Sequence, residues 1–183
     1  MSTSHQPPAT GHGIETPSVW AARWADRVPA GGRVLDLACG SGRHARYFAT
    51  RGCPVEAVDR DPAALAALAG VPGVTIRCAN LEGGPWPYDG ERFAGVVVAN
   101  YLHRPLFPRL LDCLAPEGVL IYETFAAGNE RYGRPSNPAF LLRPGELLDF
   151  VRGRLRVIAY EDLTVSEPRP ACLQRLCAIN NLI

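Results

Sequence analysis

Short apolar runs alternate with amphipathic stretches over most of the chain. Five runs have the length and composition of buried strands, and they occupy residues 33–38, 54–59, 74–79, 93–100 and 119–125. Strands that are apolar almost throughout are typical of parallel sheets covered by helices on both faces. The pattern therefore predicts an α/β fold, with a doubly wound, mostly parallel sheet and helices on both faces.

The stretches between these runs carry the start and stop signals of helices. In the first of them Thr16 is the candidate cap and Pro17 the first helical residue. Such signals predict helices over residues 16–28, 42–52, 61–70, 105–118 and 144–153. Two longer strand candidates, 154–165 and 171–181, close the chain and can pair as a hairpin.

The length of 183 residues favours one domain, which we place at residues 16–183. Residues 1–15 are rich in Ser, Thr, Pro and Gly and lack the apolar stretch of a secretory signal, so we expect a disordered tail. No linker divides the rest of the sequence. One core is therefore expected after the tail.

Charge and cysteine usage narrow the choice of partners. The net charge is +1, so no strong field favours nucleic acid or an anionic membrane. The apolar runs are too short to cross a bilayer. The six cysteines form no C-x-x-C pair, which predicts free thiols in a reducing cytoplasm and no metal site. A small molecule is the expected partner, and the oligomeric state stays open.

Polar residues gather where the predicted strands end. Ligands of open α/β sheets bind outside the carboxyl ends of the strands, so these residues are the candidates for a site. They are Asp36 with the Gly40/Gly42 turn, then Asp59, then Asn80 to Glu82, Asn100 to His103, and Glu123 with Thr124.

Two nucleotide cofactors fit the glycine turn. Residues 40–45 satisfy G-x-G-x-x-G/A, the fingerprint of dinucleotide binding, and Asp59 is placed to hold ribose hydroxyls. Asp36 separates the two cofactors, because a carboxylate repels a pyrophosphate by roughly 4 kcal/mol at ~4 Å and an effective dielectric of 20. S-adenosylmethionine has no phosphate and carries a cationic sulfonium and ammonium. Arg43 and His44, at the start of the helix, could instead welcome phosphate or point to solvent.

The stretch from Val34 to Leu65 carries a family resemblance. Asp36-Leu-Ala38-Cys-Gly40-Ser-Gly42 resembles the D-x-G-x-G-x-G motif of class I S-adenosylmethionine-dependent methyltransferases, with alanine in place of the first glycine. The resemblance covers roughly residues 30 to 125. Within that class the chain is similar to the small tellurite-resistance-type methyltransferases, through the stretch FLLRPGELLDFVRGRLRVIAYED.

This resemblance implies a fold and a donor site. The fold is a seven-stranded sheet of the Rossmann-like methyltransferase type, whose last strand is antiparallel and inserted beside the fifth. The cofactor is S-adenosyl-L-methionine. Its implied contacts are Asp36, Ala38, Cys39, Gly40, Ser41 and Gly42 at the methionine moiety, Asp59 at the ribose, Arg60, Asn80, Leu81 and Glu82 at the adenine, and Asn100, Tyr101 and Leu102 along the donor.

Methyl transfer asks for alignment and exclusion of water, and for a base only if the acceptor must lose a proton. His103 is the candidate base, because it follows a strand and its ordinary pKa is near 6.5. Tyr101 could orient the acceptor. Glu123 is a second candidate base, although it could equally pair with an arginine in the core.

The stretch of residues 124–143 is the least regular part of the interior. Loops of this length in compact domains are uncommon unless they are functional, so we expect a lid over the pocket. It contains Arg131, Tyr132 and Arg134. These residues predict contacts to an acceptor that carries a carboxylate or another anion, with solvent-exposed charges as the alternative.

Three functions are compatible with the sequence. The first is a methyltransferase that acts on a small soluble acceptor. The second is a small NAD(P)-binding oxidoreductase, which Asp36 disfavours and for which we find no Tyr-x-x-x-Lys pair. The third is a non-catalytic protein that binds S-adenosylmethionine. The acceptor itself is not predicted, since Asn100-Tyr101-Leu102-His103 lacks the prolines of an N-P-P-Y signature.

Overall fold

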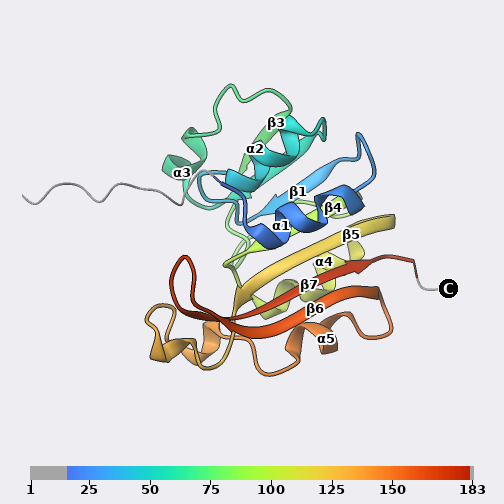
Figure 1. Ribbon diagram of the computed structural model, residues 1–183. Helices are drawn as coiled ribbons and strands as arrows, with labels where there is room; N and C mark the ends of the chain where they lie inside the picture. Colours follow the sequence, from blue (N-terminus) through green and yellow to red (C-terminus); the bar gives the residue numbers. More distant parts are fainter. Residues whose placement is uncertain (1–15, 182–183) are drawn as a thin grey trace, which may run out of the picture.

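The computed structural model describes residues 16–181, which form a sheet with helices on both faces (Figure 1). The predicted tail, residues 1–15, lies outside the described residues. The sheet has seven strands in the order β3-β2-β1-β4-β5-β7-β6. The strands are β1 (Val34–Leu37), β2 (Val55–Asp59), β3 (Val74–Cys78), β4 (Phe93–Ala99), β5 (Leu114–Phe125), β6 (Arg156–Val165) and β7 (Ala171–Ile179).

Strands β1 to β5 are mutually parallel, and β7 is antiparallel to both β5 and β6. This arrangement confirms the predicted doubly wound sheet with its reversed last strand beside the fifth. The order of strands reverses between β1 and β4, whose carboxyl ends therefore open a crevice.

The helices form two layers. The α-helices are α1 (Val19–Trp24), α2 (Arg43–Thr50), α3 (Pro62–Ala66), α4 (Phe107–Asp112) and α5 (Glu146–Val151). The 3-10 turns are η1 (Ala25–Arg27), η2 (Arg104–Leu106), η3 (Asn129–Arg131) and η4 (Pro138–Phe140). Helices α1, α2 and α3 pack on one face of the sheet, and α4 and α5 pack on the other. None of the helices in residues 16–181 is long and apolar enough to cross a membrane.

Each face of the sheet has its own apolar core. Leu35 and Leu37 of β1 join the core under α4 and α5, whereas Val34 joins the core under α1 to α3. This alternation follows from the two-residue period of a strand. Asp36 points to the same face as Val34, so a carboxylate stands there at the end of a buried strand.

Several predicted helices begin or end elsewhere; the one predicted over residues 61–70, for example, ends at Ala66. The first predicted helix is capped by Ser18, whose Oγ accepts from the backbone N–H of Ala21, and not by Thr16. The helix predicted over residues 105–118 ends at Asp112, and β5 already begins at Leu114. The Asn180 amide holds the carbonyls of Leu114 and Ala115, and this contact from the far end of the chain keeps the segment extended.

Candidate functional site

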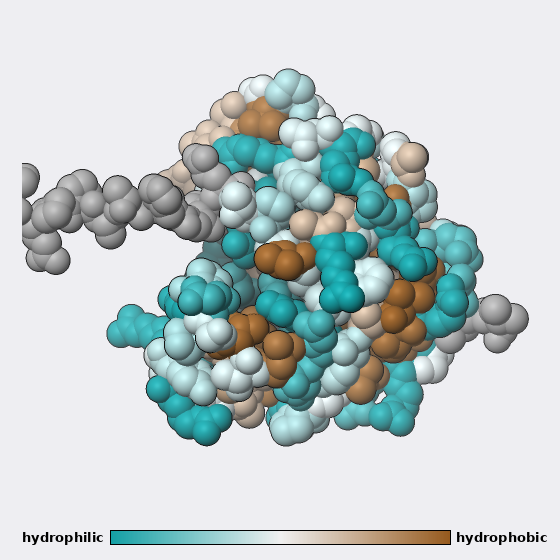
Figure 2. All heavy atoms as spheres, in the orientation of Figure 1, coloured by the Kyte–Doolittle hydropathy of each residue, from teal (hydrophilic) through white to brown (hydrophobic). Residues whose placement is uncertain are grey.

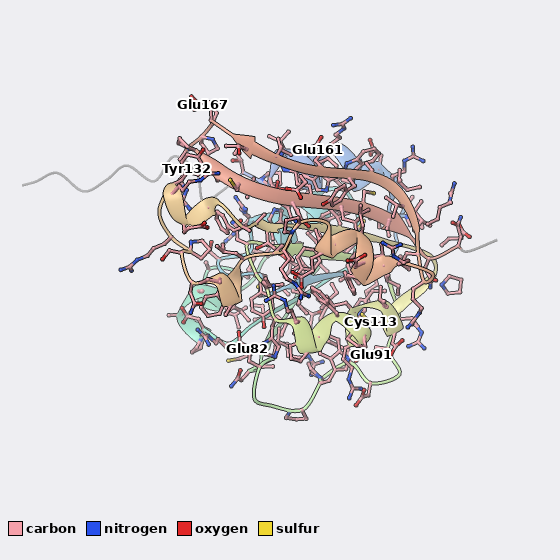
Figure 3. The ribbon with its side chains drawn as sticks, turned by 90° about the horizontal axis from the view of Figure 1, so that it is seen from below. Glu82, Glu91, Cys113, Tyr132, Glu161 and Glu167 are labelled. Carbon is pink, nitrogen blue, oxygen red and sulfur yellow. The ribbon has the colours of Figure 1, made fainter. Side chains whose placement is uncertain are left out.

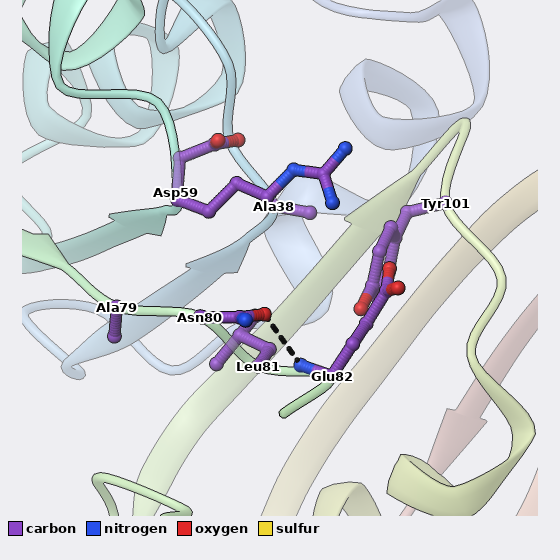
Figure 4. Close-up of a pocket in the computed structure, with 8 residues that line it drawn as sticks. Ala38, Asp59, Ala79, Asn80, Leu81, Glu82 and Tyr101 are labelled. Atoms are coloured by element: carbon purple, nitrogen blue, oxygen red, sulfur yellow. Dashed lines mark hydrogen bonds between the residues drawn. The ribbon is translucent and has the colours of Figure 1, made fainter. Parts of the chain in front are cut away.

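Two adjacent cavities open at the carboxyl ends of the central strands. The first is lined by Ala38, Asp59, Arg60, Ala79, Asn80, Leu81, Glu82 and Tyr101 (Figure 4). The second is lined by Asp36, Ala38, Cys39, Gly40, Ser41, Arg43, His44, Ala99 and Asn100. Ala38 lines both cavities. Twelve of the fourteen donor contacts that the resemblance implies therefore line this crevice. Of the other two, Gly42 caps the helix behind the crevice and Leu102 is buried in the apolar core.

The turn after β1 has an unusual backbone. Ala38, Gly40 and Gly42 have φ values of +52°, +55° and +80°. At Gly42 a Cβ atom would come within 2.4 Å of the Leu68 side chain, so only glycine fits between α2 and α3. Ala38 adopts a left-handed conformation that favours glycine, and the strain of that conformation lies at the centre of the site.

Asp36 is fully buried below the turn. Its Oδ2 accepts a hydrogen bond of 2.8 Å from the backbone N–H of Ala45 in α2. Burial raises the pKa of Asp36 to about 7, although this hydrogen bond and the charge of Arg43 act in the opposite direction. Within the described residues no ion pair neutralises Asp36. The carboxyl group therefore lies in a cavity that would favour a cation beside it.

Asp59 at the end of β2 organises the turn. Its Oδ2 accepts from the backbone N–H of Gly40 at 2.8 Å, and its Oδ1 accepts from the backbone N–H of Asp61 at 3.0 Å. The side chain is half-buried and lines the first cavity. Each carboxylate oxygen can accept more than one hydrogen bond, so Asp59 can hold the turn and still face a ligand.

Tyr101 carries a buried hydroxyl without a hydrogen-bond partner in the described part of the chain. Figure 4 shows its ring beside the Glu82 side chain, whose backbone N–H donates to Asn80 Oδ1 at 3.1 Å. Burial and the Glu82 carboxylate raise the pKa of Tyr101 well above its ordinary value, so the hydroxyl keeps its proton. A buried donor without an acceptor is costly, and a ligand in this cavity could accept its hydrogen bond.

His44 is a site residue whose position the sequence left open. It lies in the first turn of α2, is buried and lines the second cavity. Its Nε2 accepts from the backbone N–H of Ser18, which ties the start of α1 to this cavity. Burial, together with the charge of Arg43, lowers the pKa of His44 to about 3, so the imidazole is neutral. The sequence feature that could have identified His44 is its position two residues after Gly42, in the first turn of a helix that starts at the crevice.

Two candidate bases lie outside the residues that line these cavities. His103 is half-buried and precedes η2, two residues after Tyr101. Glu123 is buried in β5, and its Oε2 accepts from Arg175 Nε, while Arg175 also reaches Glu161. Glu123 thus has the core ion pair that the sequence allowed as an alternative.

The segment after β5 is held in place by side-chain hydrogen bonds at its start. Asn129 is buried; its Nδ2 donates to the carbonyl of Pro135 and its Oδ1 accepts from the backbone N–H of Cys172. Tyr132 is 45% exposed, and the guanidinium of Arg131 lies 5.8 Å from the centre of its ring. Neither of these side chains lines the two cavities, nor does Arg134. Figure 3 shows Tyr132 and Glu82 nearer one end of the molecule and Cys113 and Glu91 nearer the other.

The crevice suits a cationic nucleoside. Asp36, Asp59 and Glu82 bring carboxylates to its walls, and Tyr101 offers a hydroxyl. Figure 2 shows a recess at the left of the view, between the upper and the lower part of the molecule. Among the described residues no group of three or more His, Cys, Asp or Glu side chains could hold a metal ion.

Comparisons with known proteins agree with this geometry. Residues 34–118 match the family described as "Methyltransferase domain". No curated protein matches the chain. The fold is similar to that of TehB from Haemophilus influenzae, with a TM-score of 0.72 and 15% identity over 86% of this chain and 60% of that one. The present chain thus spans 60% of the length of that protein.

Two other solved structures match over most of both chains. A TehB-like S-adenosylmethionine-dependent methyltransferase from Corynebacterium glutamicum has a TM-score of 0.66 and 19% identity, over 90% of this chain and 89% of that one. A methyltransferase from Mesorhizobium loti has a TM-score of 0.69 and 20% identity, over 91% and 100%. The predicted fold is confirmed, and the match over residues 34–118 agrees with the predicted methyltransferase class.

Proposed function

We propose, on the premise that residues 34–118 form a class I S-adenosylmethionine-dependent methyltransferase domain, that this chain methylates a small soluble acceptor with an anionic group. The observation that supports the choice of donor is Asp36. It is a buried carboxyl group without an ion-pair partner in residues 16–181, and it faces the cavity beside the glycine turn.

The donor site has two ends. Asp36 and the turn from Ala38 to Gly42 would hold the methionine moiety, whose ammonium compensates the buried carboxylate. Asp59 would accept from the ribose hydroxyls, while Glu82 and Tyr101 border the base. These roles assign the cationic end to the second cavity and the nucleoside end to the first.

The chemistry required of the protein is modest. S-adenosylmethionine, when bound, supplies a methyl group activated by a sulfonium. The chain aligns the donor through Asp36 and Asp59 and excludes water with the walls of the crevice. His103 would accept the proton of an acceptor that must lose one. Glu123, held by Arg175, would keep β7 beside β5 and take no proton.

Arg131, Tyr132 and Arg134 would form the acceptor side. Two guanidiniums on an exposed segment favour a carboxylate or another anion, and Tyr132 offers an aromatic surface. Proteins of similar fold include N-methyltransferases that act on a glycopeptide and on coclaurine, so the fold alone does not select the acceptor. The charge of the segment is what supports an anionic one.

Calorimetric titration of the purified chain tests the donor assignment. S-adenosylmethionine and S-adenosylhomocysteine should bind, and NAD should not. Asp59→Asn should weaken both ligands about tenfold, because an amide accepts only at one atom from the ribose hydroxyls. Asp89→Asn, an exposed acid elsewhere on the surface, is the matched control and should leave both affinities unchanged. Tight binding of NAD, or unaltered affinity in Asp59→Asn, would refute the assignment.

A further inference from the structure

Arg104 joins two regions that are far apart in the sequence. It is the first residue of η2, three residues after Tyr101 of the donor cavity. Its Nε and Nη2 donate to the two carboxylate oxygens of Glu146 at 2.6 and 2.9 Å. Its Nη1 and Nη2 also donate to the carbonyls of Ala139 and Leu141 at 2.8 and 2.9 Å. One guanidinium thus bridges the donor loop to the end of the segment after β5.

Glu146 is the fixed point of this contact. It lies at the start of α5 and is buried, and it also accepts from the backbone N–H of Arg143 at 2.7 Å. Burial alone would raise the pKa of Glu146, but the hydrogen bonds from Arg104 and Arg143 lower it to about 2. The carboxylate therefore stays charged at neutral pH.

The donor side of the bridge is equally well anchored. The Tyr122 hydroxyl of β5 donates to the carbonyl of Tyr101 at 2.9 Å, and the backbone N–H of Asn100 donates to the carbonyl of Glu123 at 2.9 Å. Tyr101 and Arg104 are thus joined by a short turn whose backbone is held at Asn100 and Tyr101.

The segment on the other side has few further attachments along its exposed part. Asn129 ties its start to β7, and Gln174 ties its end through the carbonyl of Arg143. Between these points Arg104 holds η4, whose Phe140 is 52% exposed. Within the described residues no other side-chain hydrogen bond or ion pair reaches η4 from beyond its N-terminal cap. The next residue, Leu141, is buried against Phe125, Ala171 and Leu173, and the backbone N–H of Leu142 donates to the carbonyl of Phe125. Removing Arg104 would therefore loosen η4 while its C-terminal end stays attached to β5.

We propose that Arg104 is a positioning residue that fastens the acceptor segment, residues 129–141, to the donor loop, residues 100–104. Ligand binding at the donor site should therefore reduce local opening of the acceptor segment. The inference rests on the proposed function, because it takes Tyr101 to contact the donor. Coupling of this kind needs a continuous physical path between the sites, and the path here runs from Tyr101 through η2 and Arg104 to η4.

Hydrogen exchange of the full chain, with and without S-adenosylhomocysteine, tests the proposal. In the wild type the ligand should slow exchange both in residues 36–42 and in residues 137–142. In Arg104→Met the ligand should still protect residues 36–42, but its effect on residues 137–142 should disappear. The free variant should exchange ~tenfold faster at residues 137–142, because a local opening becomes easier there.

Arg143→Met is the matched control. It also removes a guanidinium from Glu146, at 3.4 Å, but it leaves the Arg104 bridge in place. It should keep the response of residues 137–142 to the ligand. If Arg104→Met does not fold, Arg104→Lys replaces it, since a lysine can pair with Glu146 but cannot also reach both carbonyls.

The outcomes separate the two proposals. No protection of residues 36–42 in the wild type would overturn the donor site and the coupling together. Protection of residues 36–42 without a response at 137–142 would overturn the coupling alone. An equal response in the wild type and in Arg104→Met would also overturn it, because Arg104 would then have only a structural role.

Discussion

Asp36 and Glu146 are both buried carboxyl groups, and their surroundings are opposite. Glu146 receives two guanidiniums and a backbone N–H, and its pKa falls to about 2. Asp36 receives one backbone N–H and no ion pair within residues 16–181, and its pKa rises to about 7. A carboxylate that the protein neutralises itself holds the fold together. A carboxylate that faces a cavity and has no ion pair of its own among the described residues, with only the positive charge of Arg43 nearby, instead suits a cationic ligand.

The largest effect should come from the cost of burying Asp36. Its folded pKa of about 7 exceeds its unfolded value of 3.8, so the folded state binds the extra proton and stability is lost as the pH rises from 3.8 to 7. Asp36→Asn lacks this proton. Its stability relative to the wild type should therefore grow by ~4 kcal/mol between pH 4 and pH 8. Urea denaturation of both proteins at a series of pH values measures this difference in the free energy of unfolding. A difference that does not change with pH would contradict the prediction.

Removing Glu146, the neutralised carboxylate, should lower the free energy of unfolding. Glu146→Ala leaves Arg104 without its partner and releases η4 and the start of α5. We expect a loss of about 3 kcal/mol, at the low end for a buried pair because Arg104 is partly exposed. Urea denaturation at pH 7 is the measurement. Asp149→Ala, at an exposed pair on the same helix, is the control and should change stability little. Wild-type stability in Glu146→Ala would refute the view that this neutralised carboxylate stabilises the fold.

His44 is a third buried titratable group, and burial keeps it in its neutral form. Its folded pKa of about 3 lies below the unfolded 6.5, so the stability that it contributes is present above pH 6.5 and is lost as the pH falls toward 3. Asp36→Asn should reveal this slope, which opposes that of Asp36 in the wild type. His44→Gln can keep an acceptor for the Ser18 N–H, and between pH 7 and pH 5 it should flatten the acid limb by about 2 kcal/mol. An unchanged limb would show that His44 is not held neutral by burial.

The smallest effect concerns the strained turn between the two cavities. Ala38 has a φ of +52°, where a Cβ costs roughly 1–2 kcal/mol. Glycine relieves this strain but makes the unfolded chain more flexible. Ala38→Gly should therefore stabilise the protein by only ~0.5 kcal/mol, as measured by thermal unfolding. Ala63→Gly in α3 is the control, and it should destabilise. Destabilisation by Ala38→Gly would mean that the methyl group makes a contact worth more than the strain.

The sequence predicted the sheet, and the gathering of polar residues around one crevice, because both follow from local patterns. Apolar runs mark the parallel strands, and polar residues such as Asp36 and Asp59 mark the strand ends. The end of α4 was predicted wrongly, because Asn180 holds Leu114 and Ala115 extended from 66 and 65 residues away. The same limit hid the roles of Arg104 and His44. Their partners, Glu146 and Ser18, are 42 and 26 residues away, and no local pattern reports such contacts.

The affinity for S-adenosylmethionine of the wild type and of Asp36→Asn, titrated at pH 6 and at pH 8, tests the central claim most directly. The wild type should bind several-fold more tightly at pH 8, where Asp36 is ionised, and should release a proton on binding. At pH 8 the affinity of Asp36→Asn should be at least about tenfold lower than that of the wild type, and it should depend little on pH. Equal affinity of the two proteins at pH 8 would contradict the claim that this buried carboxylate serves a cationic donor.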